Sequence, residues 1–332
     1  MIFDFSDTQK MIRETLRDFV REKVTPNTSS WDRTEEFPRA ALVELASLGF
    51  LGMLVSSEEG GTGLGFAELT VAVEEIGRSN ASLGLAVANL NTLAIPCLRK
   101  EILLRSLLCG EKLAAFVSCP AAPIAAKKEK GSWVLDGVSA PTLLVGVADH
   151  FLVGTSTGEL VLLDRTVDGL SVLPSKKIHG CRSAAVGRLK LTHAKCPSSS
   201  VLKNLPGAWD RYLLALSAVT VGVARGALET ALEYSKQRHQ FGGPIADIQA
   251  IQWMLAESSV QVEAAQLLVA HAAFLTDNGA GAGSTIAQAR ALASKAALKS
   301  CGCAVQIHGG YGYIKDYPVE RYQRDAQFCA AV

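Results

Sequence analysis

Apolar positions repeat with a helical period through the first part of the chain. In residues 4–26 they follow the i, i+4, i+8 spacing of a single buried stripe, which predicts an amphipathic helix. Ser6 or Asp7 can cap its amino end, and Pro26 is expected to end it. The stripe consists of Met11, Ile12, Leu16, Phe19 and Val20.

Two further segments, residues 37–50 and 66–94, show the same helical pattern. The stretch SSEEGGTGLG between them is rich in glycine and small polar residues, which predicts a loop. From about residue 113 the pattern changes to short segments rich in valine and leucine and interrupted by glycine and aspartate. Such segments are typical of antiparallel strands and turns. They are residues 132–138, 150–165 and 186–194.

Helical periodicity returns from about residue 204, in segments long enough to form a bundle. The first of them carries Ala, Gly and Ser at positions where a second helix can approach closely. The segments are residues 208–239, 245–279 and 284–310. We therefore expect a mainly α, α+β protein with three domains. They are an N-terminal α-helical domain (1–112), a middle antiparallel β-domain (113–203) and a C-terminal four-helix bundle (204–332).

Composition is that of a globular protein, with 332 residues, 48% hydrophobic and 20% charged. The formal net charge of +1 does not indicate a nucleic-acid partner, which requires a basic excess on one face. The apolar run Tyr212–Ala224 is interrupted by Ser217 and Thr220 and is shorter than a membrane span, so we expect no membrane partner.

Cysteine usage predicts a reducing compartment. The eight cysteines form no C-x-x-C pair and no Cys/His cluster with zinc spacing, so we expect no metal site. Reduced, mostly buried thiols are typical of a cytoplasmic protein. The first residues, MIFDFSDTQK, carry acids and no apolar core, and we predict no signal peptide.

The order of helices and strands resembles the acyl-CoA dehydrogenase family over nearly the whole chain, and four stretches similar to motifs of that family carry the resemblance. The last two are long and specific, which makes chance similarity very improbable. In chain order the stretches are LASLGFLGMLVSSEEGGTGLG, GSWVLDGV with VADHFLV, YSKQRHQFGGPIADIQAIQWMLAE, and AVQIHGGYGYIKDYPVERYQRDA.

The resemblance implies FAD bound between subunits of a tetramer, and it assigns cofactor-binding residues. In the family, Arg and Phe of the R-x-x-F-G motif, here Arg238 and Phe241 with Gln240 between them, reach a flavin held mainly by a neighbouring subunit. The glycine turn, here Gln306, Gly309 and Gly310, approaches the same dinucleotide. A guanidinium pairs well with phosphate oxygens. Glycines have no Cβ, so they let peptide N–H groups approach the phosphates closely.

For other residues near these motifs, a structural role has to be weighed against a role in binding the cofactor. Gln249 either contacts the cofactor or lies on a polar face of the bundle. His308 is expected to be a packing residue. Arg321, Arg324 and Asp325 are expected to form a structural ion-pair network at a subunit contact.

The family removes the α-proton of an acyl thioester with a carboxylate, and this chain departs from the pattern there. The usual glutamate follows the arginine of the last motif by about nine residues, and the sequence ends at Val332, one residue short of that place. Other members hold the base on the preceding helix. Counting back from Arg238 without gaps places Tyr212 at the position of that base. A two-residue shift of the alignment places Asp210 there instead. Asp210 can equally be a helix N-cap.

The predicted β-domain also departs from the sequence pattern of the family. Ser118 can replace the threonine with which the family contacts the flavin, but Cys119 stands where the family has glutamate, and the family's A-G-S-D segment is missing. Leu144, at the second flavin-facing position, cannot donate a side-chain hydrogen bond. We therefore expect the subunit to lend Arg238, Phe241 and the turn at residues 306–312 to the flavin of a homologous partner in a heterotetramer, while it holds its own flavin weakly or not at all.

Three functions follow from the resemblance. The first is α,β-desaturation of an acyl-CoA thioester with FAD, in a homo- or hetero-oligomer, with electrons passing to an electron-transfer flavoprotein. The second is a non-catalytic subunit that completes a partner's FAD site. The third is different chemistry on an acyl group attached to a carrier protein in a biosynthetic pathway. A fold does not decide among them.

Overall fold

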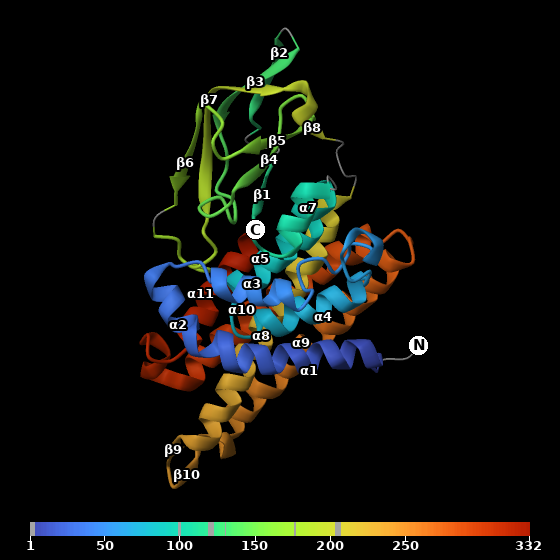
Figure 1. Ribbon diagram of the computed structural model, residues 1–332. Helices are drawn as coiled ribbons and strands as arrows, with labels where there is room; N and C mark the ends of the chain where they lie inside the picture. Colours follow the sequence, from blue (N-terminus) through green and yellow to red (C-terminus); the bar gives the residue numbers. More distant parts are fainter. Residues whose placement is uncertain (1–3, 99–100, 119–122, 130, 176, 203–206) are drawn as a thin grey trace.

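The computed structural model describes residues 4–98, 101–118, 123–129, 131–175, 177–202 and 207–332. Two groups of helices lie below two small sheets in the view of Figure 1. This is the helix, sheet and helix order that the sequence predicts. The division at residues 112 and 203 stays a prediction.

The N-terminal helices begin with α1 (Asp7–Phe19), and Ser6 caps it in a reciprocal capping box with Gln9. Pro26 does not end the helical segment, contrary to the prediction. A π-helical turn (Val20–Val24) leads directly into α2 (Thr25–Thr34), in which Pro26 is the second residue, so the helical segment continues past the proline. Met11 is 62% exposed, so it does not belong to the buried stripe.

The other N-terminal helices enclose a largely apolar core, and the predicted glycine-rich loop connects two of them. They are α3 (Arg39–Ser47), α4 (Phe66–Gly77), α5 (Ala81–Asn89), α6 (Ile95–Cys97) and α7 (Glu101–Leu108). A π-helical turn, Leu90–Ala94, joins α5 to α6.

The strands form two four-stranded sheets, in the orders β1-β4-β5-β8 and β2-β3-β7-β6. The pairing is antiparallel as predicted, except that β1 and β4 run parallel. The strands are β1 (Ala114–Val117), β2 (Ala125–Glu129), β3 (Ser132–Val138), β4 (His150–Gly154), β5 (Leu160–Asp164), β6 (Leu170–Pro174), β7 (Gly187–Pro197) and β8 (Val201–Leu202).

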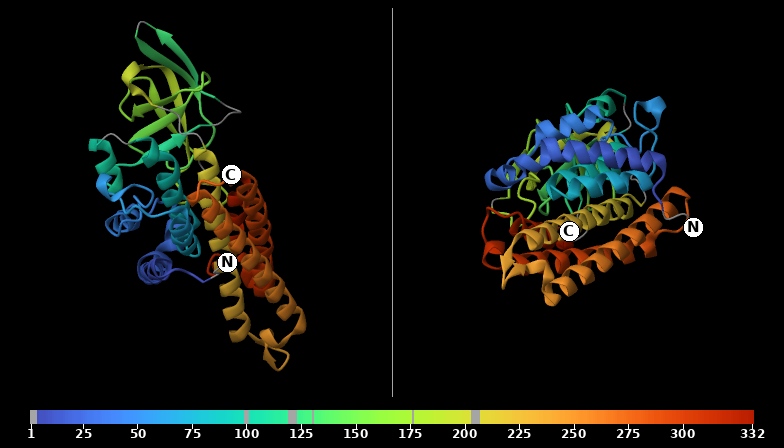
Figure 2. Two further views of the ribbon diagram at one scale, coloured as in Figure 1. Left: turned by 90° about the vertical axis from the view of Figure 1, so that its right-hand side faces the viewer. Right: turned by 90° about the horizontal axis from the view of Figure 1, so that it is seen from below.

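The C-terminal helices pack as the predicted four-helix bundle, with the long helices side by side (Figure 2). They are α8 (Ala208–Gln237), α9 (Gln249–Asp277), α10 (Gly283–His308) and α11 (Val319–Ala331). A short hairpin, β9 (His239–Gln240) and β10 (Gly243–Pro244), follows α8. By length and composition α8 could cross a membrane, but 72% of its most apolar window is buried, which is typical of a core helix.

Helix α8 packs directly on α4, because two glycines on α8 remove the side chains between them. A Cβ at Gly222 would lie 2.2 Å from the Glu74 carbonyl oxygen, and one at Gly226 would lie 2.1 Å from the Arg78 carbonyl oxygen. Only glycine permits such an approach. This confirms the close helix contact predicted from the small residues of α8.

Polar groups add to the contact between the N-terminal helices and the bundle. The Asp277 carboxylate, at the end of α9, accepts hydrogen bonds from the Phe66 and Ala67 N–H groups at 2.7 and 2.9 Å. It thereby caps α4 from 211 residues away in the sequence. The buried Glu74 carboxylate lies 3.1 Å from Arg225 Nη2 and accepts hydrogen bonds from Gln266.

Replacing Asp277 by Ala should destabilise the fold by about 1 kcal/mol, because two N–H groups at the start of α4 lose their acceptor. Chemical denaturation measures the effect, and Asp277→Asn, which keeps one oxygen acceptor, should lose less. Asp168→Ala is the control, because Asp168 is exposed and outside this contact. Equal stability of Asp277→Ala and Asp168→Ala would contradict the capping role.

Glu74 should make stability depend on pH. Burial raises its pKa from 4.5 to about 7, outweighing the opposite effect of Arg225. Because the folded state holds the proton more tightly than the unfolded state, the stabilising contribution is present at low pH and is lost as pH rises toward 7. Relative to Glu74→Gln, the wild type should lose on the order of 3 kcal/mol of unfolding free energy across this window. Glu14→Gln, at an exposed position, is the control, and a pH-independent difference between wild type and Glu74→Gln would refute this account.

Candidate functional site

The hairpin after α8 presents the predicted R-x-x-F-G residues at one end of the molecule, far from the two sheets (Figure 1). Arg238 ends α8 in an extended conformation, and its carbonyl oxygen accepts a hydrogen bond from Ile245 N–H at 2.8 Å. Phe241 and Gly242 form the turn with φ of +55° and +90°, and positive φ at both positions is typical of a tight hairpin. Phe241 is 96% exposed, so a strained residue holds an aromatic ring in solvent.

A glycine turn at the end of α10 faces this hairpin. Gly309 has φ +58° and ψ −132°, a conformation that favours glycine. A Cβ at Gly309 or Gly310 would meet no atom within 4 Å, so the backbone there borders open space. Gly312 is required for another reason, because a Cβ would lie 2.4 Å from the Val305 carbonyl oxygen.

The hairpin and the glycine turn border a cavity of about 470 Å³ that is open to solvent. Four of the predicted cofactor-binding residues, Arg238, Gln240, Gly309 and Gly310, line it together. Arg238 forms no ion pair with any described residue, and its Cζ lies 5.7 Å from the centre of the Tyr311 ring. An unpaired guanidinium beside a glycine backbone that borders open space is suited to bind a phosphate group.

Aromatic rings form one wall of the cavity. The Tyr234 and His308 rings stack with centroids 4.0 Å apart, and Tyr317 meets both rings edge-on. His308 Nδ1 lies 2.8 Å from the Ala304 carbonyl oxygen, and burial lowers the pKa of the imidazole. A neutral, stacked His308 is the packing residue that the sequence predicts. Burial raises the pKa of Tyr234, against the effect of Arg238, so its phenol stays neutral.

Sequence reasoning missed Tyr234 and Ile245 as lining residues of this cavity. Tyr234 precedes Arg238 by four residues, so helical periodicity could have placed both on one face. Phe241 lies at the hairpin tip, outside the cavity lining. Gln306 and Gln249 are exposed, on the last turn of α10 and at the first position of α9, and they do not line it either.

The predicted flavin-facing residues of the β-domain lie elsewhere. Ser118 follows β1 and borders a space with no room for a water molecule, where its hydroxyl packs against Gly154. Leu144 is buried with φ +66°, and its N–H donates to the Ala184 carbonyl oxygen at 3.1 Å. Neither the Leu144 side chain nor its N–H is therefore free to donate to a ligand. Cys119 lies outside the described residues.

The two candidates for the base differ in exposure. Asp210 lies in the first turn of α8 with its side chain exposed. It is not the N-cap, which corrects that interpretation, because Gly207 takes the cap position with φ +72°. Tyr212 is buried, its hydroxyl has no partner, and burial raises its pKa, so it is unsuited to accept a proton.

The ion-pair network predicted on the last helix is present, and its contacts lie within the chain. Arg324 donates to Asp32 of α2 at 2.7 and 3.2 Å and to Glu320 at 2.8 and 2.9 Å. Asp325 accepts from the Cys181 N–H at 2.6 Å, and Arg321 donates to the Ser79 carbonyl oxygen at 2.8 Å. The network fastens α11 to the N-terminal helices and to the loop before β7.

Comparison with known proteins identifies the motifs. Two family models match, the acyl-CoA dehydrogenase N-terminal domain over residues 6–101 and the acyl-CoA dehydrogenase C-terminal domain over residues 209–331. A relative from Aromatoleum aromaticum, benzylmalonyl-CoA dehydrogenase, is 32% identical, with 99% of this chain and 94% of the relative covered.

Solved structures agree with these matches. Butyryl-CoA dehydrogenase from Megasphaera elsdenii superposes with a TM-score of 0.92 and 28% identity, covering 99% of this chain and 95% of that one. A chain from a structure of the electron transferring flavoprotein of Acidaminococcus fermentans superposes with a TM-score of 0.93 and 27% identity. The match covers 99% of this chain and 94% of that one. On these matches, and on the motifs that line the cavity, the chain belongs to the acyl-CoA dehydrogenase family.

Proposed function

We propose that this chain is an FAD-dependent oxidoreductase subunit that desaturates acyl thioesters and that it contributes the nucleotide half of a flavin site to a neighbouring subunit. The observation that carries the proposal is the cavity between the β9–β10 hairpin and the glycine turn. Arg238, Gln240, Gly309 and Gly310 come together there, beside a wall of aromatic rings.

The residues of this cavity fit the diphosphate and nucleotide part of FAD. The Arg238 guanidinium has no carboxylate partner, and Tyr311 supports it from one side. Gly309 and Gly310 leave room for a ligand where a Cβ would otherwise project. When bound, FAD supplies the hydride acceptor for the β-hydrogen of the acyl group. The chain itself holds the diphosphate with Arg238, beside the open backbone of the glycine turn.

The positions of the two parts of the site support its division between two subunits. The β9–β10 hairpin and the two sheets are at opposite ends of the molecule (Figure 1), so Arg238 and Ser118 cannot line one cavity within a chain. Together they can reach one cofactor only if different chains supply them. The exposed Phe241 at the hairpin tip is suited to such a contact.

Helix α9 offers the surface for association. Trp253, Val260, Leu267 and Phe274 recur every seven residues, and each is 50–69% exposed. Residues at this spacing share one helix face, so they form a continuous apolar stripe. Exposed apolar stripes of this kind mark protein contacts. We propose that a second copy or a homologous subunit covers it.

Asp210 is the proposed base for the α-proton of the thioester. It begins α8, and in the described structure it has no hydrogen-bond or ion-pair partner. An exposed carboxylate is a weak base, so the proposal requires that bound substrate exclude water from it. Whether the acyl group is attached to coenzyme A or to a carrier protein is left to the experiment below.

The second candidate function is a subunit that completes a partner's site without its own catalysis. The buried Leu144 favours it, because the residue expected at the second flavin-facing position offers the ring no hydrogen-bond donor. For either function, the likeness to the Acidaminococcus fermentans chain supports an electron-transfer flavoprotein as electron acceptor. A cytoplasmic location and a role in fatty acid metabolism belong to the same proposal.

Arg238→Ala should lower the affinity for FAD about 10- to 100-fold, because a charged hydrogen bond contributes roughly 1.5–3 kcal/mol. Quenching of flavin fluorescence measures affinity, and circular dichroism checks that the fold is intact. Lys236→Ala is the matched control, since Lys236 is an exposed cation two residues earlier. FAD affinity unchanged in Arg238→Ala would refute the nucleotide site.

Asp210→Asn should abolish bleaching of the flavin absorbance on anaerobic addition of substrate, because the α-proton has no acceptor. Acyl-CoA and carrier-bound acyl esters are titrated in parallel to identify the substrate class. Wild-type bleaching that requires an added homologous subunit supports the second function. Undiminished bleaching in Asp210→Asn would exclude Asp210 as the base.

A further inference from the structure

Arg238 combines a fixed backbone with a guanidinium that has no polar partner. Its N–H donates to the Tyr234 carbonyl oxygen at 2.9 Å, and its carbonyl oxygen accepts from the Ile245 N–H at 2.8 Å. Within the part of the chain that the structure describes, its exposed side chain forms neither an ion pair nor a hydrogen bond. An arginine side chain has many rotamers, so binding a phosphate group costs entropy unless another contact has already restricted them.

The Tyr311 ring provides such a contact. The Arg238 Cζ lies 5.7 Å from the ring centre, which is within the range of a cation–π interaction. Both side chains line the cavity between the β9–β10 hairpin and the glycine turn, and Tyr311 is 44% exposed. A carboxylate could also hold the guanidinium, but it would neutralise the charge and occupy N–H donors. An aromatic ring leaves the charge and the N–H groups available to a phosphate.

Tyr311 is itself held by a cluster of aromatic rings. Its ring centre lies 5.3 Å from that of Tyr317. Tyr317 in turn meets the Tyr234 ring of α8 at 5.9 Å and the His308 ring of α10 at 5.6 Å, in both cases edge-on. Aromatic pairs in this arrangement attract each other. Because Tyr234 lies one helical turn before Arg238, the rings connect the guanidinium back to the helix that carries it.

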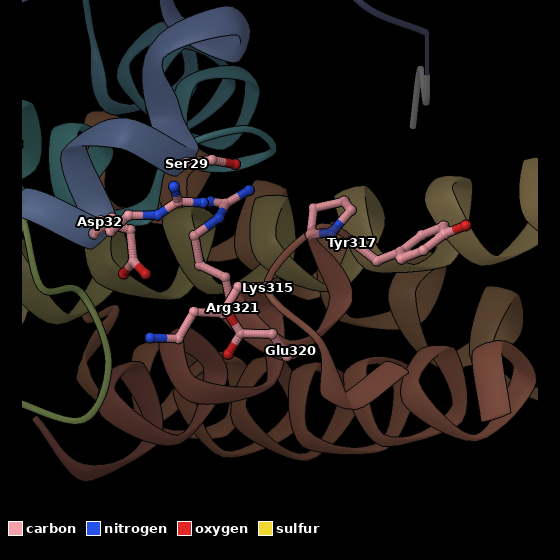
Figure 3. A pocket seen from close by; sticks show the side chains of 8 residues that line it. Ser29, Asp32, Lys315, Tyr317, Glu320 and Arg321 are labelled. Carbon is pink, nitrogen blue, oxygen red and sulfur yellow. The ribbon is translucent and has the colours of Figure 1, made fainter. Parts of the chain in front are cut away.

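The segment that carries these rings is fixed on both sides. Gly312 packs so closely on α10 that a Cβ there would lie 2.4 Å from the Val305 carbonyl oxygen. Tyr317 comes directly before the N-cap of α11, and the Arg324 network fastens that helix to α2. In Figure 3 the Tyr317 ring extends away from the charged side chains around the start of α11. The position of Tyr311 is therefore set by the fold before any ligand binds.

We propose that Tyr311 is a positioning residue, which holds the Arg238 guanidinium ready for the phosphate groups of a nucleotide without neutralising it. The inference rests on the proposed function, because it assumes that this cavity takes the diphosphate of FAD. It adds a residue that acts on binding through Arg238. The contribution of Tyr311 should therefore vanish when Arg238 is absent.

The experiment measures the affinity of the chain for FAD by quenching of flavin fluorescence. Tyr311→Leu should lower the affinity about three- to fivefold, as expected for the loss of a cation–π contact at an exposed site. Tyr311→Phe keeps the ring and should bind FAD as the wild type does. Tyr313→Leu is the matched control, because Tyr313 is 80% exposed and lies outside the cavity lining, and its affinity should not change.

A double-mutant cycle separates positioning from direct contact with the ligand. Tyr311→Leu added to Arg238→Gln should cause no further loss of affinity, because no guanidinium remains to be held. An equal loss in both backgrounds would show that the ring acts on the ligand or on the fold by itself, and would overturn the inference. Tyr311→Phe that binds as weakly as Tyr311→Leu would overturn it as well.

Failure of the proposed function gives a different result. A wild type without affinity for FAD, or Arg238→Ala that binds as the wild type does, would refute the nucleotide site and this inference with it. If Arg238→Ala weakens binding and Tyr311→Leu does not, the site stands and only the role of Tyr311 is overturned. Circular dichroism of each variant checks that the fold is intact.

Discussion

Helix α8 touches α4 through backbone atoms, and the rest of the structure is built around this contact. Gly222 and Gly226 are one helical turn apart, and a Cβ at either would collide with an α4 carbonyl oxygen. Because α8 also packs on α9, α10 and α11, its position sets the position of the bundle. The same helix carries Asp210 at its start and Arg238 at its end, so both candidate functional groups depend on this packing.

Local signals in the sequence are enough to predict much of this architecture. Ser6 caps α1 because a hydroxyl followed by glutamine at the third position satisfies two N–H groups, and such a signal is contained in four residues. The fates of Pro26 and Met11 were not predictable in this way. A π-helical turn accommodates the proline, and the neighbours that α1 acquires on folding decide which of its apolar residues is buried.

Contacts between distant parts of the chain account for what the sequence could not predict. No pattern near Phe66 indicates that Asp277 will cap its helix, and the parallel pairing of β1 with β4 depends on how the chain crosses the sheet. The candidate site shows the same division. Arg238, Gln240, Gly309 and Gly310 were found by resemblance to motifs, whereas the stacking of Tyr234 on His308 arises only when α8 packs against α10.

The apolar stripe on α9 has a consequence for how the protein is made. A single chain keeps Trp253, Val260, Leu267 and Phe274 in water unless the proposed second subunit covers them. Surfaces of this kind are recognised by chaperones and proteases and promote aggregation when concentrated. In the proposed assembly with a homologous subunit, chains made in excess of that subunit would be degraded or would aggregate, so that the less abundant subunit would set the number of complete assemblies.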